Sequence, residues 1–349
     1  MPHKGNNEQA PIFIIDAGAR GGIQHQWISS PYPVAILGFE PDEDECRSLN
    51  KGLRKGKGGD QTPTIRYFPY ALDKERGRRK LYLYRDRRLS SFFHPNMDAL
   101  KYFPLDTLLM PDAFAVDAEV IVECVSLDEC RRNEGIPEVD FIKLDTQGSE
   151  LGILQGGSET LSQAFGVAVE VAFVAIYEGQ PLFSDVDTFL RERGFSLFDL
   201  NRHWWKRDVP PSVQSRGQMI FADALYLRDI ASSGCDRSGS FWHTVSTKSA
   251  KLVKTVVIAS LLGYSDYGMN LLDLYRERKL IDERTYDSWR SSYITVHGEW
   301  KPDKPSLWQR GLRMMYERFS HALGLPADRE QFEVFNARFY DNDESKDYR

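Results

Sequence analysis

The chain has 349 residues, of which 41% are hydrophobic and 12% aromatic. This composition is too apolar for a disordered chain and supplies enough side chains for a sizeable core. The net charge of −6, from 45 basic and 51 acidic residues, argues against general binding to nucleic acid or to anionic lipid. At roughly 150 residues per domain, the length predicts a little over two domains.

The cysteines and the first residues of the sequence both indicate a reducing compartment. The first eleven residues, MPHKGNNEQAP, are polar and lack the apolar core of a signal peptide. No apolar run approaches the length of a membrane span. We therefore expect a cytoplasmic protein without a membrane span, and we expect no metal site because His and Cys show no ligand spacing. The cysteines, which show neither CxxC spacing nor a disulfide-dense pattern, are Cys46, Cys124, Cys130 and Cys235.

Extended apolar runs alternate with helical patterns through residue 228. Such alternation predicts an α/β fold with a mainly parallel sheet that is covered on both faces. The strands are expected at 12–16, 34–40, 65–70, 81–84, 119–127, 139–145, 167–173, 195–200 and 219–226. The helices are expected at 24–29, after Asp42, at about 149–154 and at 185–193. The loops or irregular insertions are expected at 51–63, 104–117 and 203–217.

After residue 228 the helical period dominates. We therefore predict one domain over 1–228 and a C-terminal helical domain or extension over 229–349. Amphipathic helices there would suit a lid over the acceptor site, a homodimer contact, or a separate bundle that binds a partner. The expected segments are a linker at 232–240 and helices at 250–262, 270–280 and 306–323 and after Asp328.

The first motif with chemical content is Asp16-Ala-Gly18-Ala-Arg-Gly-Gly22, between a predicted strand and a predicted helix. Glycines let the backbone approach a ligand, and a helix N-terminus offers free N–H groups. The spacing is not G-x-G-x-x-G, which argues against a nicotinamide dinucleotide. Glu40, at the end of the next strand, is placed either to accept both hydroxyls of a ribose or to cap a helix. A tight turn without a ligand is the alternative, but the turn and the acid together favour a nucleoside cofactor.

After the glycine turn and Glu40, the third motif with chemical content is Val139-Asp-Phe-Ile-Lys-Leu-Asp145-Thr-Gln147-Gly-Ser-Glu150. A buried strand would carry Asp145 to its carboxyl end, where ligands of open α/β sheets bind. Asp145 is therefore a candidate general base or a residue that orients the amino group of a cofactor. Glu150 suits the first turn of a helix without any chemistry, so its role stays open.

These motifs occur in an order that resembles one known family. The turn at Asp16, then Gly38-Phe-Glu40-Pro41, then Val125-Ser-Leu-Asp-Glu, then Asp140 to Glu150, continuing through LGILQGG and Val-Glu170-Val, are similar to the FkbM family of S-adenosylmethionine-dependent methyltransferases. The similarity spans about 12–227. It implies a class I methyltransferase (Rossmann-like) fold with seven strands, the last of them antiparallel. It also implies methyl transfer, usually to a hydroxyl of a sugar, glycan, polyketide or other natural product.

The resemblance also implies roles for particular residues. Glu40 and the following Pro41 match the ribose-binding segment, and Ala71 and Leu72 lie where the family flanks adenine. Arg20 stands where the family usually has Asn, and it would either approach the methionine carboxylate or point to solvent. The cofactor turn is matched by Asp16, Gly18, Ala19, Arg20 and Gly22, and Asp145 matches the acid after the fourth strand.

Further candidates surround the expected acceptor. Ser91 would reach the methionine end of the cofactor, and His94 is the second candidate base after Asp145; both residues also suit a plain surface loop. The family often has Glu where Gln147 stands, and we place Gln147, Glu170 and Tyr177 against the acceptor. The basic run 76–88 would bind an anionic acceptor or form a solvated hairpin.

The sequence thus predicts an S-adenosylmethionine-dependent O-methyltransferase with a small-molecule or glycan acceptor and no nucleic-acid partner. A homodimer through the C-terminal helices is an accompanying hypothesis. Two other interpretations remain: a non-catalytic assembly protein with a degenerate methyltransferase fold, and an NAD-dependent oxidoreductase.

Overall fold

The computed structural model describes residues 10–22, 27, 30, 32–53, 63–103, 113–136, 138–207, 216–228 and 249–297. The chain divides into two compact units, 1–290 and 291–349. Several expectations lie outside the described residues: most of the helix at 24–29, the linker at 232–240, and the helices at 306–323 and after Asp328. In the part of the chain that is described, no helix has the length and apolar character needed to cross a membrane.

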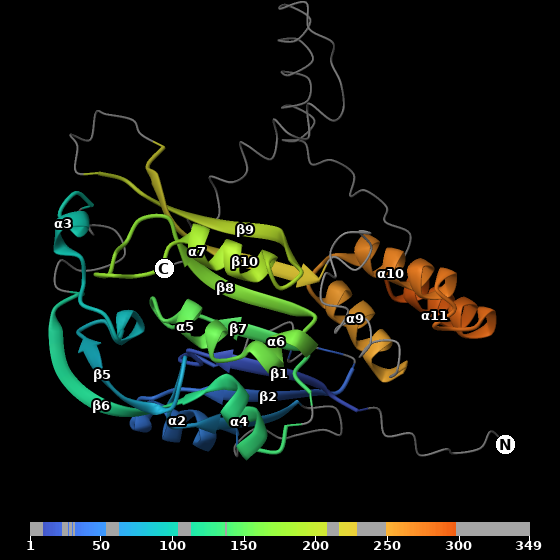
Figure 1. The fold of residues 1–349 in the computed structure, drawn as a ribbon, viewed down its shortest axis with the longest axis horizontal. Helices are drawn as coiled ribbons and strands as arrows, with labels where there is room; N and C mark the ends of the chain where they lie inside the picture. The colour runs from blue at the N-terminus through green and yellow to red at the C-terminus, as the bar shows by residue number, and fades with distance from the viewer. Residues whose placement is uncertain are drawn as a thin grey trace, which may run out of the picture. The chain divides into compact units, whose positions relative to one another are not determined.

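A seven-stranded sheet forms the centre of the fold, in the order β3-β2-β1-β7-β8-β10-β9 (Figure 1). Neighbouring strands from β3 to β8 are parallel, whereas β10 runs antiparallel to both β8 and β9. This order, with an antiparallel last strand, confirms the predicted α/β fold. The strands are β1 (Ile12–Ala17), β2 (Val34–Phe39), β3 (Thr64–Phe68), β7 (Phe141–Leu144), β8 (Gly166–Ala172), β9 (Phe195–Trp205) and β10 (Gln218–Arg228).

One face of the sheet packs on a layer of helices, and this contact forms the main core. Side chains alternate across a strand, so Val167, Val169 and Val171 of β8 all point into that core, at most 1% exposed. Each buried valine of this kind contributes roughly 1.5–3 kcal/mol relative to an exposed one. The helices of this layer, which lie in front of the sheet in Figure 1, are α4 (Leu127–Asn133), α5 (Glu150–Gln155), α6 (Ser158–Gln163) and α7 (Phe183–Arg191).

A separate three-stranded sheet has the order β4-β6-β5. Its strands, β4 (Ala71–Asp73), β5 (Gly77–Tyr84) and β6 (Val116–Ser126), enclose a small core of their own. The basic run 76–88 lies on β5 and the following turn, where acids of neighbouring segments pair with it. The solvated hairpin is therefore the interpretation that the structure favours over an anion site. The remaining elements of this region are η1 (Arg87–Leu89), α3 (Met97–Leu100) and, beside β3, α2 (Glu43–Leu53).

Helix α9 (Ser249–Leu261) is anchored at the starting end of β7. Asp140, immediately before that strand, is fully buried and accepts from Lys251 Nζ at 2.6 Å and from Lys254 Nζ at 2.9 Å. The backbone N–H of Phe13 donates to the same carboxylate at 2.9 Å. In α10 (Ser265–Glu277), Tyr267 donates to the carbonyl of Arg228 at 2.6 Å.

These two helices therefore lie at the edge of the sheet where the parallel strands begin, opposite the edge where ligands of such sheets bind (Figure 1). A lid over the acceptor is thus wrong for α9 and α10. A further helix, α11 (Glu283–His297), was not predicted. The expected irregular insertion at 203–217 was also wrong at its start, because β9 continues to Trp205 and pairs with β10.

Candidate active site

The turn after β1 makes a tight backbone contact with the end of β7. Gly18 has a φ of +77°, and a Cβ built on it would lie 1.8 Å from the carbonyl oxygen of Asp145. Only glycine satisfies both the positive φ and this close approach. The backbone N–H groups of Gly18 and Ala19 each donate to the carbonyl of Phe39 at 3.2 Å. The turn is therefore fixed to the carboxyl ends of both neighbouring strands, β7 and β2.

Two further glycines of the turn border open space. Gly21 and Gly22 have φ values of +82° and +91°, and a Cβ on either would meet no atom of the described chain within 4 Å. The turn thus presents backbone without side chains toward the edge of the sheet. Such a surface lets a ligand approach the peptide groups closely.

Lys143 is a site residue that the sequence analysis missed. Its Nζ lies 3.1 Å from Asp16 Oδ1 and 3.8 Å from Asp145 Oδ2, and it donates to the carbonyl of Gly18 at 3.0 Å. Burial alone would lower the pKa of Lys143, but Asp16, Asp145 and Glu170 together raise it. Burial raises the pKa of Asp16, and Lys143 opposes that shift. A lysine inside an otherwise apolar strand, two residues before Asp145, was the available signal.

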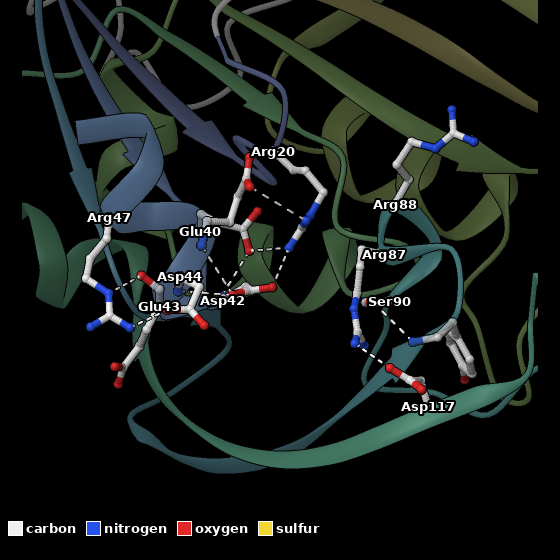
Figure 2. Close-up of polar contacts among 12 residues, drawn as sticks. Arg20, Glu40, Asp42, Glu43, Asp44, Arg47, Arg87, Arg88, Ser90 and Asp117 are labelled. Carbon is white, nitrogen blue, oxygen red and sulfur yellow. Dashed lines mark hydrogen bonds and ion pairs between the residues drawn. The ribbon is translucent and has the colours of Figure 1, made fainter. Parts of the chain in front are cut away.

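Glu40 and Arg20 face each other at the end of β2 (Figure 2). Glu40 is only 5% exposed, and its Oε1 accepts from the N–H of Asp42 at 2.9 Å. Arg20 Nη2 lies 3.5 Å from the same Oε1 and 2.8 Å from Asp42 Oδ2. The structure therefore shows Arg20 neither pointing to solvent nor turned to a separate anion site, because its guanidinium is paired with these acids.

A second network joins the ends of β7 and β8. Gln147 has a φ of 57°, a left-handed conformation that is uncommon for a residue with a side chain. Its Nε2 donates to Asp145 Oδ1 at 3.0 Å and to Glu170 Oε1 at 3.3 Å, while Tyr177 donates to its Oε1 at 2.9 Å. The hydroxyl of Ser91 donates to the backbone carbonyl of Gln147 at 2.6 Å. Of the five residues predicted at the acceptor side or as base, four are therefore Gln147 itself or hydrogen-bonded to it, and only His94 is not among them.

Glu170 has little cationic compensation, since within the described chain only the charge of Lys143 opposes the rise of its pKa. Among the described residues no ion pair reaches its carboxylate, and burial followed by the charge of Asp145 raises the pKa of Glu170 well above its usual value. Asp145, whose side chain is 41% exposed, instead lies beside Lys143. The two carboxylates bridged by Gln147 thus differ in their environment, which is the arrangement that separates acid and base roles.

Glu150 holds the loop after β7. Its carboxylate accepts from the N–H groups of Thr146 at 2.7 Å and Gly148 at 3.0 Å, and burial raises its pKa. These bonds give Glu150 a structural role in shaping the loop. Ser91, 1% exposed, is engaged in the same way, since it also accepts from the N–H of Phe93 at 3.1 Å. Its predicted contact with a cofactor stays a prediction.

The remaining candidates have simpler surroundings. Ala71 and Leu72 are buried in β4, and their place beside an adenine stays a prediction, while Pro41 is half-buried beside Glu40. His94 is exposed and its ring lies 4.1 Å from that of Tyr82. No hydrogen bond or ion pair among the described residues joins the His94 side chain to Asp145, so its role as a base stays a prediction.

The sheet order, with glycine turn and acid at the ends of β1 and β2, defines a class I methyltransferase fold. Residues 18–197 match the Methyltransferase FkbM domain. The chain therefore belongs to the FkbM methyltransferase family.

Two curated relatives agree with this membership. The chain is 35% identical over 192 residues to the "2-O-methyltransferase NoeI" of Sinorhizobium fredii, and this alignment covers 52% of this chain and 72% of that protein. It is 24% identical over 221 residues to the "Methyltransferase sdnD" of Sordaria araneosa, covering 59% and 82%. A solved structure, the methyltransferase FkbM from Methylobacillus flagellatus, aligns with a TM-score of 0.33 at 14% identity, over 62% of this chain and 43% of that chain.

Proposed function

We propose that the protein transfers a methyl group from S-adenosylmethionine to a hydroxyl oxygen of a small-molecule or glycan acceptor. The observation that carries the proposal is the placement of the Gly18 turn and the buried carboxylate of Glu40 at adjoining strand ends. The similarity to a protein named as a 2-O-methyltransferase supports oxygen as the atom that receives the methyl group. A cytoplasmic location and a homodimer through the C-terminal helices are proposals that rest on sequence composition and pattern alone.

The residues present fit an adenosine cofactor. Both contacts that the described residues make with the Glu40 carboxylate use the same oxygen, Oε1, so the second oxygen is the one that we assign to a ribose hydroxyl. The turn at Gly21 and Gly22 offers backbone to the methionine end, and Asp16 is placed to attract its ammonium group. When bound, this cofactor supplies a methyl group on an electrophilic sulfonium. The protein's share is then to hold the acceptor oxygen in line and to accept its proton.

For the proton we propose the carboxylate pair that Gln147 bridges. A base must lie within hydrogen-bond reach of the hydroxyl, and a raised pKa strengthens a carboxylate as proton acceptor. Glu170 has the raised pKa, while Asp145 is the more exposed of the two and is ion-paired with Lys143. Tyr177 holds the bridging amide, so it sets the direction of both carboxylates.

Calorimetric titration of the purified full chain with S-adenosylmethionine and, separately, with NAD tests the proposal. We expect saturable heat with the first ligand and none with the second. Glu40→Gln should weaken S-adenosylmethionine about 10- to 100-fold, because a charged hydrogen bond of roughly 1.5–3 kcal/mol is lost. Glu43→Gln, at an exposed position at the start of α2, is the matched control and should bind as the wild type does.

The possible outcomes separate the three interpretations of the sequence. Heat with NAD alone would favour an oxidoreductase and overturn the proposal. Binding of S-adenosylmethionine without methyl transfer to any hydroxyl acceptor in a metabolite screen would favour the assembly protein. In the presence of transfer, Asp145→Asn and Glu170→Gln identify the base, since the base variant loses turnover while it retains cofactor affinity.

A further inference from the structure

Arg20 is placed to act on the residue that we assign to the cofactor ribose. Its guanidinium lies among three carboxylates: Nη2 is 3.5 Å from Glu40 Oε1 and 2.8 Å from Asp42 Oδ2, and Nη1 is 4.0 Å from Glu45 Oε2 (Figure 2). The Arg20 side chain is 24% exposed and that of Glu40 is 6% exposed. The pair is thus largely removed from water, and partly buried ion pairs are screened less than exposed ones.

The backbone fixes the two residues relative to each other. The N–H groups of Gly18 and Ala19 both donate to the carbonyl of Phe39, the residue directly before Glu40. Arg20 directly follows this pair of donors. These bonds hold the backbone of Arg20 close to that of Glu40, so the guanidinium reaches the carboxylate from a neighbouring turn.

The charges around Glu40 need a counter-charge. Burial raises the pKa of the Glu40 carboxyl; the N–H of Asp42 and the charge of Arg20 oppose that shift, while Asp42 and Glu45 add to it. The thiol of Cys46 is also close enough for Glu40 to raise its pKa, although burial of the thiol is the larger cause. Arg20 is thus the cation of a site that otherwise gathers acids.

The charge of Arg20 also reaches a further acid. Asp86, before η1, has a lowered pKa, chiefly because Arg88 bonds to it and in lesser part because of Arg20. Since Arg88 pairs directly with Asp86 at 2.7 Å, Asp86 has its own cation. The strong contacts of Arg20 are those on the side of Glu40 and Asp42.

We propose that Arg20 is a positioning residue for ribose recognition: it keeps the buried Glu40 carboxylate ionised and aimed so that its second oxygen accepts a ribose hydroxyl. The inference rests on the proposed function, because it concerns the adenosine end of the same site. Arg20 acts through Glu40 and does not itself hold the methionine carboxylate. It therefore matters equally for every ligand that carries the ribose.

Calorimetry with two probes, S-adenosylmethionine and adenosine, tests this role. Adenosine has the ribose but lacks the methionine carboxylate. We expect Arg20→Gln to weaken both ligands by the same factor, about 10-fold at pH 7, the size of a charge-assisted hydrogen bond. Arg20→Lys should recover most of the affinity because it retains the charge. Arg47→Gln, which removes the exposed pair of Arg47 with Asp44 on α2, is the matched control and should leave both affinities unchanged.

The pH dependence separates this role from a merely structural one. Without Arg20, the pKa of Glu40 rises further, because an opposite charge is removed from beside a buried carboxylate. A protonated Glu40 accepts fewer hydrogen bonds. The affinity of Arg20→Gln should therefore fall as the pH decreases, whereas the affinity of Arg20→Lys should change less.

Each result decides one question. If only S-adenosylmethionine weakens, Arg20 holds the methionine carboxylate and the inference is overturned; unchanged affinity for both ligands also overturns it. Non-additivity is a second criterion, since Arg20→Gln should add little to Glu40→Gln. If the wild type binds neither ligand, the proposed function fails, and this outcome is distinct from a failure of Arg20 alone.

Discussion

Loss of the ion pairs of the buried Asp140 carboxylate should lower the free energy of unfolding more than loss of any other ion pair described above. Asp140→Asn keeps the shape of the side chain but removes the charge that Lys251 and Lys254 share. The two lysines are 1% and 4% exposed, so they would remain buried without an anion. Breaking a buried ion pair in this way costs about 3–5 kcal/mol, against a total stability of roughly 5–15 kcal/mol for a folded domain.

Urea denaturation followed by far-UV circular dichroism measures this loss. With a slope of about 1–3 kcal/mol per molar urea, the midpoint should fall by roughly 1–5 M. Burial lowers the pKa of Lys251 already in the wild type, and the loss of Asp140 lowers it further. The unfolded chain then binds more protons than the folded one between that lowered pKa and about 10.4, so stability rises with pH across this window. The defect of Asp140→Asn should therefore shrink as the pH rises through that window.

The control is Asp98→Asn, which removes the exposed pair of Asp98 with Lys101 at 2.8 Å. Exposed pairs of this kind are worth about 0–1 kcal/mol, so the midpoint should scarcely move. If Asp140→Asn costs no more than this control, or if its defect grows with pH, the reasoning that the lysines are held by Asp140 is refuted.

Three further substitutions probe the site itself. Gly18→Ala should destabilise the protein by about 3 kcal/mol or more in thermal unfolding, because the added Cβ would overlap a backbone carbonyl. The control, Gly21→Ala, should cost only about 1 kcal/mol, for the positive φ of Gly21. Equal losses would contradict the close contact at Gly18. Tyr177→Phe should destabilise by about 1–3 kcal/mol in urea, since its buried hydroxyl lies within hydrogen-bond distance of two acceptors, the Leu89 carbonyl and Gln147 Oε1, and no measurable loss would argue against that network. Glu150→Ala should cost about 2–3 kcal/mol in the same assay by releasing two backbone N–H groups of the loop, and a neutral result would return Glu150 to the candidates for chemistry.

The central sheet could be predicted because its strands are continuous apolar runs whose ends carry short polar motifs. The run from Val139 to Asp145 has both features, and the structure places β7 at the middle of the sheet. The second sheet was harder, since the runs at 81–84 and 119–127 look alike whether they join the main sheet or pair with each other. Their pairing depends on contacts between distant segments, which a periodic pattern does not contain.

Side-chain directions account for most of what the sequence did not show at the site. Lys143 was overlooked because a lone lysine in an apolar strand has no motif, and its meaning lies in Asp16, which belongs to another strand. The direction of Arg20 depends on acids that α2 brings beside it. The bridge from Gln147 to Glu170 likewise joins two residues that are 23 positions apart in the chain and that lie near the ends of two different strands.

The anchoring of α9 at Asp140 also determines where this chain can be shortened. A protein cut after residue 228, at the end of β10, would lose both lysines and leave a buried aspartate with one backbone N–H as its remaining partner in the described chain. A cut after residue 290, at the boundary of the first compact unit, would keep the aspartate and both cations together. The first two C-terminal helices are therefore part of the minimal folded unit, because their contacts hold the starting ends of the strands.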